Sequence, residues 1–503
     1  MSTPIPENRF ACDSHMLAAV TGGKVVCSSP SGKTLTSAGN EKRAAGITTD
    51  SRKVRPNGVY LALKGENHDG HAFLAQAEDA GASIVVVERG RGAGVTRAEI
   101  VEVDDTLVAW GRIARARLHA WRRGSPIART LAITGSAGKT TTKEVCAALL
   151  STLGVTHKSA GNLNNRVGVP AVALALEDLT RFAVFEAGMN LPGEIAALAE
   201  VIEPDVSILT NVGIAHAGGL ATHALVRAGR DAREAVAEEK GALLVGTKDV
   251  IVVNADDAFA MSQTSRSRAR VVSFGRAKGA AYRLVAREPN GNGARIVFTR
   301  TAGSSSTEHL DVSVPGEAFA MNVLAALAAA DAAALVGGGQ PIGCDRIGPA
   351  LAHVQVEGRL ALVPLANGAL IIDDTYNANP SSFAASLATL GEVAGNRRRV
   401  VVLGEMKELG ELADTAHRDL GRALANAGVT LAIGCGGRLV NLALTEARNR
   451  GVGVVIADDV NDAAQEATGR VVARDVVLVK GSRSVSAEVV VHELAKHFGI
   501  GPR

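Results

Sequence analysis

The chain has 503 residues, of which 47% are hydrophobic, 21% charged and 3% aromatic, with a formal net charge of +3. Domains usually hold roughly 100–200 residues, so this length excludes a single core and predicts three or four domains. The weak net charge and the lack of a dense basic block argue against a nucleic-acid partner. Five scattered cysteines without a Cys-x-x-Cys pair argue against a disulfide framework or a zinc site. No apolar leader opens the chain, so we expect a cytoplasmic protein.

Residues 1–108 are expected to form a small α/β domain. Runs rich in branched side chains predict strands at residues 59–63 and 83–87, with a glycine-terminated helix between them at 71–81. A further helix is expected at 107–121. The polar turn around Ser51 and Arg52 indicates no function by itself.

Residues 109–340 repeat strands and helices, which predicts a parallel sheet covered on both faces. Strands are expected at 131–134, 182–186, 206–211 and 250–254, helices at 192–202 and 224–240, and a β-rich section at 270–314. An alanine-rich helix is expected at 323–335. It is interrupted by Asp331 and, at this length, too short to span a bilayer.

After a glycine-rich boundary at 337–341, residues 341–503 predict a second doubly wound sheet. Its strands are expected at 370–373, 400–403, 431–433, 454–456 and 476–479. Ser381 is expected to cap the helix that follows Pro380. The predicted fold class is therefore α/β with three domains.

A phosphate-binding loop is the strongest motif of the chain. It consists of Gly135, Ser136, Ala137, Gly138, Lys139 and Thr140, between a strand and a helix. The glycines let successive backbone N–H groups turn inward, and the helix N-terminus adds partial positive charge. Lys139 can reach outer phosphates and the Thr140 hydroxyl can ligate Mg²⁺.

Several residues near strand ends could assist this loop. Glu186 ends a predicted strand, where its carboxylate would reach a metal ion beside the loop. The alternative is a glutamate that faces solvent and has no functional role. His216 follows the next strand and, taken alone, is more often structural. Lys240, late on a helix, is interpreted as a lysine that interacts with the helix dipole.

Two amide-rich turns add candidates for substrate binding. Asn162, Asn164 and Asn165 crowd one loop, and their amides can donate to phosphate or accept from substrate amides, although asparagines also form ordinary turns. Asp374, Tyr376 and Asn377 follow a strand of the third domain and suit ribose hydroxyls or a polar substrate. Lys480 and Arg483 leave another strand there and suit a carboxylate or phosphate, against the alternative of a solvated turn.

Together these segments resemble the Mur ligase family over nearly the whole chain. The shortened phosphate loop, with one residue fewer than the commonest nucleotide loop, matches the superfamily. The asparagine loop at 161–165, the segments at 374–380 and 403–410, and Lys480, Gly481, Ser482 and Arg483 resemble the member that uses a dipeptide. Residues 50–52 and 61–65 resemble the family's uridine-side domain.

The resemblance implies a three-domain ligase. It would have a UDP-substrate domain (1–108), a central ATP-binding P-loop domain (109–340) and a C-terminal Rossmann-like domain (341–503). ATP would phosphorylate the terminal carboxylate of UDP-N-acetylmuramoyl-tripeptide, and the amine of D-Ala-D-Ala would attack the acyl phosphate. Such an enzyme needs ATP, Mg²⁺ (two ions are expected) and these two small molecules; a monomer without a membrane span is expected.

The resemblance also assigns residue roles. It makes Lys139, His216 and Lys240 catalytic, and Thr140, Glu186, His216 and a carbamylated Lys240 metal ligands, which reverses the dipole interpretation of Lys240. Asn322 would contact adenine, Arg359 phosphate and Asp374 ribose, while Ser51 and Arg52 would lie by the uridine. The family often has Gly-Arg-His-Asn before the adenine asparagine and Pro-Gly-Arg at the phosphate arginine. This chain has Gly316, Glu317, Ala318 and Phe319 in the first place, and Glu357, Gly358 and Arg359 in the second.

Other functions remain open at this point. A sister ligase that adds the third residue, or a folylpolyglutamate synthetase-like ligase, shares the phosphate loop, but the Asp-Asn-Pro-Arg acceptor motif of the diaminopimelate ligase is absent. A GTPase would carry an Asn-Lys-x-Asp motif, which is also absent. An inactive scaffold would not need the intact lysine, threonine and acid set.

Overall fold

A computed structural model of the chain describes residues 3–26, 44–65, 68–213, 217–220, 223–290, 293–301, 307–352, 354 and 356–501. They fall into two compact units. Unit 1 lies within residues 1–132, 154–188 and 194–204, and unit 2 within 133–153, 189–193 and 205–503. The three domain boundaries expected from the sequence stay a proposal; the first, at residue 108, falls inside a helix.

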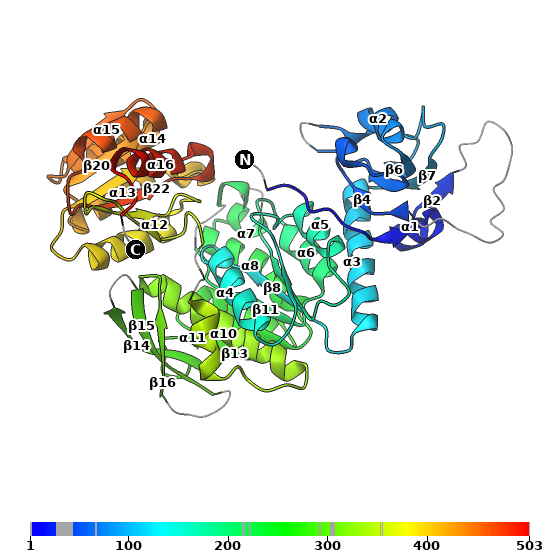
Figure 1. The fold of residues 1–503 in the computed structure, drawn as a ribbon, viewed down its shortest axis with the longest axis horizontal. Coiled ribbons are helices and arrows are strands. Elements are labelled where there is room, and N and C mark those ends of the chain that lie inside the picture. Colours follow the sequence, from blue (N-terminus) through cyan, green and yellow to red (C-terminus); the bar gives the residue numbers. More distant parts are fainter. Residues whose placement is uncertain are drawn as a thin grey trace. The chain divides into compact units, whose positions relative to one another are not determined.

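Unit 1 begins with a five-stranded sheet (Figure 1). Its order is β2 (Lys24–Val26), β7 (Glu99–Val103), β6 (Ala82–Glu88), β5 (Gly58–Leu61) and β4 (Ile47–Thr48), parallel except for β2. Around it lie β1 (Ala11–Cys12), β3 (Ala44–Ala45), α1 (Ser14–Thr21), η1 (Ser51–Lys53), η2 (Gly70–Phe73) and α2 (Leu74–Asp79). Both strands predicted here are confirmed. The predicted helix at 71–81 is a 3₁₀ turn followed by a short α-helix, and Gly81 (φ 101°) reverses the chain after it.

The rest of unit 1 packs helices against the strand order β8 (Arg129–Thr134), β10 (Phe182–Glu186) and β9 (Thr156–Lys158). The helices are α3 (Thr106–Gly124), α5 (Gly168–Leu174) and α6 (Glu194–Ile202). Helix α3 begins where the Asp105 side chain accepts the N–H of Val108. The last two residues of β8 belong to unit 2.

The first sheet of unit 2 combines parallel strands with an antiparallel meander. Its described order is β16 (Thr307–Val312), β15 (Gly293–Arg300), β14 (Tyr282–Asn290), β13 (Arg270–Gly275), β12 (Val250–Asn254) and β11 (Val206–Leu209). Its helical segments are α4 (Lys139–Ser151), η3 (Ala217–Leu220), α7 (Ala224–Arg227), α8 (Ala232–Val245), α9 (Ala258–Ser262), η4 (Thr264–Arg266) and α10 (Glu317–Val336). The single helix predicted at 224–240 is wrong. Gly229 (φ 73°) breaks it, and the Asp231 side chain caps α8 by accepting the N–H of Arg233.

Helix α10 is longer than its sequence pattern predicted. It has 20 residues and is, among the described helices, the one long and apolar enough to cross a membrane. The prediction that this helix is too short to span a bilayer is therefore wrong. Most of it is nevertheless buried in unit 2, where it packs on α4 and on β11 to β14. Its apolar character therefore has a structural explanation in the core.

The second sheet of unit 2 has the order β17 (Ala361–Pro364), β18 (Leu370–Asp373), β22 (Val476–Lys480), β19 (Arg399–Leu403), β20 (Leu431–Cys435) and β21 (Gly453–Ala457). All pairs are parallel except β17–β18, an edge that the sequence did not predict. The helical segments of this sheet are α12 (Pro380–Ala394), η5 (Gly410–Leu412), α13 (Ala413–Asn426), α14 (Arg438–Arg448), α15 (Val460–Arg470), η6 (Arg483–Val485) and α16 (Glu488–Phe498). Helix α11 (Cys344–Leu351) instead packs on α4 and β16 of the first sheet.

Successive residues of the central strands enter two different cores. Val401 and Leu478 pack with α12, α13 and α14, while Val400 and Val477 pack with α15 and α16. Both faces are thus covered, which explains the continuous apolar runs and confirms the doubly wound α/β prediction. The cap of α12 is Asn379, whose side chain accepts the N–H of Ser382, so the expectation for Ser381 is wrong.

We expect Asp331 to be essential for the stability of unit 2. It is fully buried on α10, where it accepts hydrogen bonds from Tyr282 (2.8 Å), Arg300 (2.9 Å) and the N–H of Ile342 (2.7 Å). Asp331→Leu leaves these donors unpaired and should cost about 3–5 kcal/mol. Urea denaturation followed by circular dichroism measures this loss.

The exposed Asp345, at the start of α11, provides the matched control. Asp345→Ala removes only a favourable interaction with the helix dipole and should cost at most about 1 kcal/mol. Equal losses in the two variants would contradict the assigned importance of the buried network.

Candidate active site

The phosphate loop joins β8 to α4 with a backbone that only glycine tolerates at two positions. Gly135 has φ 150° and Gly138 has φ 82°. A Cβ on Gly135 would lie 1.9 Å from Oγ1 of Thr210, and one on Gly138 would lie 2.4 Å from Oδ1 of Asn322. The two glycines therefore let neighbouring side chains approach the loop backbone directly.

Residues directly after β11 hold this loop in shape. Thr210 Oγ1 donates to the carbonyl of Ala137 (2.6 Å), and the amide of Asn211 both accepts the N–H of Ala137 (2.9 Å) and donates to its carbonyl (3.1 Å). Ser136 Oγ accepts the N–H of Gly213 (2.8 Å). The sequence analysis missed Thr210 and Asn211, although polar residues at a strand end beside a phosphate loop could have signalled them.

The cationic and hydroxyl groups of the loop meet a residue from far along the chain. Lys139 Nζ donates to the carbonyl of Gly135 (2.8 Å), and Thr140 Oγ1 accepts from Nη2 of Arg359 (2.9 Å). The Arg359 guanidinium stacks over the ring of Tyr376, 4.2 Å from its centroid. The structure thus brings together predicted phosphate-binding residues from both halves of unit 2.

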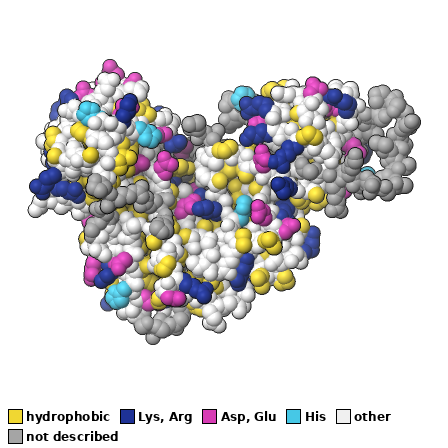
Figure 2. All heavy atoms as spheres, in the orientation of Figure 1, with side chains coloured by type: hydrophobic (Ala, Val, Ile, Leu, Met, Phe, Trp, Pro, Cys, Tyr) yellow, Lys and Arg dark blue, Asp and Glu magenta, His cyan; other side chains and the backbone are white. Residues whose placement is uncertain are grey.

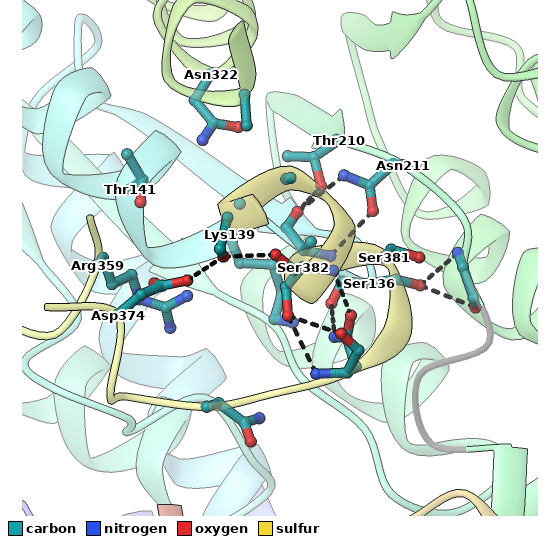
Figure 3. A pocket seen from close by; sticks show the side chains of 18 of the residues that line it. Ser136, Lys139, Thr141, Thr210, Asn211, Asn322, Arg359, Asp374, Ser381 and Ser382 are labelled. Carbon is teal, nitrogen blue, oxygen red and sulfur yellow. Dashed lines mark hydrogen bonds between the residues drawn. The ribbon is translucent and has the colours of Figure 1, made fainter. Parts of the chain in front are cut away.

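Lys139 and Arg359 border a cavity of about 410 Å³ within unit 2. In Figure 3, Asn322 of α10 lies on one side of Lys139, and Arg359 and Asp374 lie on the other. Phe274, Val314 and Phe319 line the cavity together with Asn322, which makes that end apolar. A flat base and a charged phosphate chain need such a combination of surfaces.

At the opposite end, Lys480 is tied into a buried ion pair. Its side chain is 1% exposed, and Nζ lies 2.5 Å from Oδ2 of Asp374 and 3.0 Å from the carbonyl of Asn377. Burial lowers the pKa of Lys480, whereas Asp374 acts in the opposite direction. The alternative of a solvated turn is wrong for Lys480. Arg483 is half exposed, pairs with Glu488 (3.1 Å) and faces the Tyr376 ring at 5.9 Å.

The three asparagines of the loop in unit 1 have different surroundings. Asn164 Nδ2 donates to Oε1 of Glu186 (3.0 Å), and Glu186 is 2% exposed, so the solvent-facing alternative is wrong. Asn165 Oδ1 accepts the N–H groups of Val167 (3.1 Å) and Gly168 (2.8 Å), which is a structural role at the start of α5. Asn162 is exposed.

Lys240 is buried in α8 rather than exposed near its end, so the helix-dipole interpretation is wrong. Its side chain is fully buried, and Nζ finds no hydrogen-bond partner among the described residues. Burial lowers the pKa of Lys240 well below its ordinary value, and the charge of Lys139 lowers it further. Both effects favour the neutral, nucleophilic form of the amine.

His216 lies outside the described residues. Among the residues that are described, no group of three His, Cys, Asp or Glu side chains could by itself hold a metal. An ion would therefore need oxygen ligands of other kinds as well.

The predicted uridine-side residues lie in unit 1. Ser51 is buried, and its Oγ donates to Oε1 of Gln76 (2.8 Å). Arg52 is 77% exposed and forms two 2.9 Å hydrogen bonds to Asp50, which lower the pKa of that carboxyl. The Arg52 guanidinium is therefore at the surface.

A buried histidine that the sequence analysis missed holds the segment 404–410, two of whose residues, Lys407 and Glu408, line the cavity. Nδ1 of His417 donates to the carbonyl of Ala413 (2.7 Å), and Nε2 accepts the N–H of Met406 (3.1 Å). This pattern requires the neutral imidazole. No local sequence signal identifies the role, because it depends on how α13 packs against the loop that precedes it.

Three domain-family models match the chain. The model described as "Mur ligase family, catalytic domain" matches residues 43–117, "Mur ligase middle domain" matches 133–330, and "Mur ligase, glutamate ligase domain" matches 358–483. They cover segments of all three predicted domains.

Individual proteins match over most of their length. The chain is 34% identical over 459 residues to the UDP-N-acetylmuramoyl-tripeptide–D-alanyl-D-alanine ligase of Escherichia coli (strain K12), covering 90% of this chain and 94% of that protein. A crystal structure of MurF from Acinetobacter baumannii matches with a TM-score of 0.81 and 28% identity over 97% of this chain and 100% of that one. MurF ligase from Thermotoga maritima in complex with ADP matches with a TM-score of 0.75 and 28% identity over 90% and 97%.

The geometry of His417 predicts a pH-dependent stability. Burial lowers the pKa of His417 in the folded state below the unfolded value of about 6.5. The unfolded state then binds more protons between these two values, so stability is full above about pH 6.5 and falls as pH drops below it. His417→Gln should flatten this part of the curve, measured as the urea midpoint between pH 5 and 8.

The matched control is His492→Gln on α16, whose side chain is exposed. It should leave the pH dependence of the wild-type protein unchanged. A His417→Gln curve that overlays the wild type would show that the buried imidazole does not titrate on unfolding.

Proposed function

This chain belongs to the Mur ligase family, and we propose that it is the member that joins D-Ala-D-Ala to UDP-N-acetylmuramoyl-tripeptide at the expense of ATP. The enzyme is an ATP-dependent ligase that forms a C–N bond in peptidoglycan precursor synthesis. The chain spans most of the E. coli relative that carries this name. As further proposals, it works in the cytoplasm as a monomer, without nucleic acid or a membrane span.

The observation that carries the proposal is the cavity shared by the phosphate loop and the last sheet. Its lining includes Lys139 from the loop and Arg359, Asp374 and Lys480 from the C-terminal part of unit 2. A cavity of this kind can hold a nucleotide so that its terminal phosphate points to an acceptor. The complex of the Thermotoga maritima relative with ADP agrees with nucleotide binding in this family.

In the proposed reaction the γ-phosphoryl group passes to a carboxylate oxygen of the tripeptide and ADP leaves. The amine of D-Ala-D-Ala then attacks the acyl carbon, phosphate departs, and the amine loses a proton. The loop N–H groups and Lys139 stabilise phosphate charge, and Arg359 approaches it from the other wall. Asn322 faces the base and Asp374 the ribose.

The loop fits a phosphate group, because a Cβ on Gly135 or Gly138 would close the space against its neighbours. Groups suited to magnesium are also present: the Thr140 hydroxyl, the buried carboxylate of Glu186 and, by family resemblance, His216. The Lys240 amine is buried, has a lowered pKa and finds no hydrogen-bond partner in the described part of the chain, which suits carbamylation to an oxygen ligand. Mg²⁺ bound by these groups would neutralise phosphoryl charge.

The remaining residues are proposed to bind the two organic substrates. Ser51 and Arg52 would lie by the uridine, and Asn162, Asn164 and Asn165 by the body of the precursor. Tyr376, Asn377, Lys480 and Arg483 would form the acceptor side. Of these, Lys480 acts on substrate through Asp374 and Asn377, since both already bind its ammonium.

The reaction is tested by phosphate release from ATP with each organic substrate omitted in turn. We expect turnover only when UDP-N-acetylmuramoyl-tripeptide and D-Ala-D-Ala are both present. The tripeptide is tested in two forms, one that ends in lysine and one that ends in diaminopimelate. Lys139→Ala should lower the rate by a factor of at least about 10³, since it removes the loop cation from the transition state. Equal turnover with one substrate absent, or with single D-alanine in place of the dipeptide, would contradict the assignment.

Carbamylation is tested by Lys240→Ala. The variant should lose activity and regain part of it with millimolar acetate, because the carboxylate can supply the missing oxygen ligands. Incubation with ¹³C-bicarbonate should give a carbamate NMR signal in the wild type that the variant lacks. Lys278→Ala, at an exposed lysine, provides the control and should not respond to acetate. Full activity of Lys240→Ala without acetate would refute the role.

A further inference from the structure

A second cavity, of about 230 Å³, lies within unit 1 between α3, α6 and the start of α5. Leu107 and Val108 of α3 and Leu198 and Val201 of α6 give it apolar walls. Val108 remains 37% exposed. None of the proposed catalytic residues lines this cavity.

Three arginines are among the residues that line this cavity: Arg112, Arg115 and Arg166. Figure 2 shows Lys and Arg side chains in dark blue over the segment that Figure 1 labels α3. An apolar pocket with a few converging charged groups is the usual form of a small-molecule site.

The charges of this cavity are unevenly balanced. Arg115 donates Nε to Glu203 (2.5 Å), a carboxylate that it shares with His119 and Arg122. Arg112 donates Nη1 to the carbonyl of Thr21 (2.5 Å), an uncharged acceptor. Arg166 makes no hydrogen bond or ion pair with the residues that the structure describes. Glu200 supplies one carboxylate to the lining, so positive charge is in excess.

Gly111 lets helices α3 and α6, which line the cavity, approach each other closely. A Cβ on Gly111 would lie 3.0 Å from Cγ2 of Val201, a contact tighter than side chains usually make. The close contact of Gly111 with Val201 therefore fixes the spacing of the two helices that line the cavity.

The cavity borders the loop that supports Glu186. Arg166 follows Asn165, which caps the start of α5, and Asn164, which binds the Glu186 carboxylate. A ligand that draws on Arg166 would therefore act on the segment that positions this carboxylate.

We propose that this cavity is a binding site for a small amphipathic oxyanion, a carboxylate or phosphate monoester attached to an apolar group. Arg166 and Arg112 bind the oxyanion, because a guanidinium fork matches its geometry. The apolar walls hold the attached group. The site shares no lining residue with the cavity proposed above to bind the nucleotide.

The test is isothermal titration of the full chain with benzoate and with phenyl phosphate. We expect saturable binding of at least one of them, and the tighter of the two identifies the headgroup. Inorganic phosphate and benzyl alcohol should each bind at least tenfold more weakly, since one lacks the apolar group and the other the charge.

Two variants locate the binding in this cavity. Arg166→Gln should lower the affinity for the tighter-binding probe by about tenfold or more. Ala197→Phe, which places a larger side chain in the cavity, should abolish binding. The matched controls are Arg123→Gln, at an exposed arginine later on α3, and Ala196→Phe, at an exposed alanine of α6; both should bind as the wild type does. Absence of saturable binding by both probes, or unchanged binding in Arg166→Gln and Ala197→Phe, would overturn the proposal.

Discussion

The close contact between the phosphate loop and the side chains around it is the constraint on which the rest of this structure depends. Thr210 and Asn322 approach the loop backbone where Gly135 and Gly138 lack a Cβ. The loop is held from behind by hydrogen bonds from residues after β11, which leaves its inward face available for a ligand. The cavity is built outward from this contact, and any larger residue at either glycine would move its walls.

Buried charge is handled in different ways around the molecule. Asp331 and Lys480 are paired, so their burial is compensated by hydrogen bonds and opposite charge. Lys240 forms no hydrogen bond with the described residues, and the effect of burial on its pKa outweighs that of the Glu239 charge, so this amine is costly to maintain. That contrast supports a chemical rather than a structural role for the buried Lys240, and the proposed carbamate would provide such a role.

Sequence reasoning worked well where the signal is local. Branched runs predicted the strands of both sheets in unit 2, and glycine spacing predicted the phosphate loop. It failed where two local tendencies compete. The segment 224–240 looks helical throughout, yet Gly229 and the Asp231 cap divide it. Asn164 and Asn165 look alike in the sequence, but one binds a carboxylate and the other caps a helix.

The sequence by itself determined the α/β class, most strands, the phosphate loop and the family, because these depend on side-chain branching, glycine content and spacing over a few residues. Only the tertiary structure decided which residues meet: Arg359 with Thr140 and Lys480 with Asp374 from distant segments, and His417 with the backbone of Met406 across 11 residues. It also decided that Lys240 is buried. Such pairings depend on how helices, strands and loops pack against one another, and burial depends on every neighbour at once, so no short stretch of sequence encodes them.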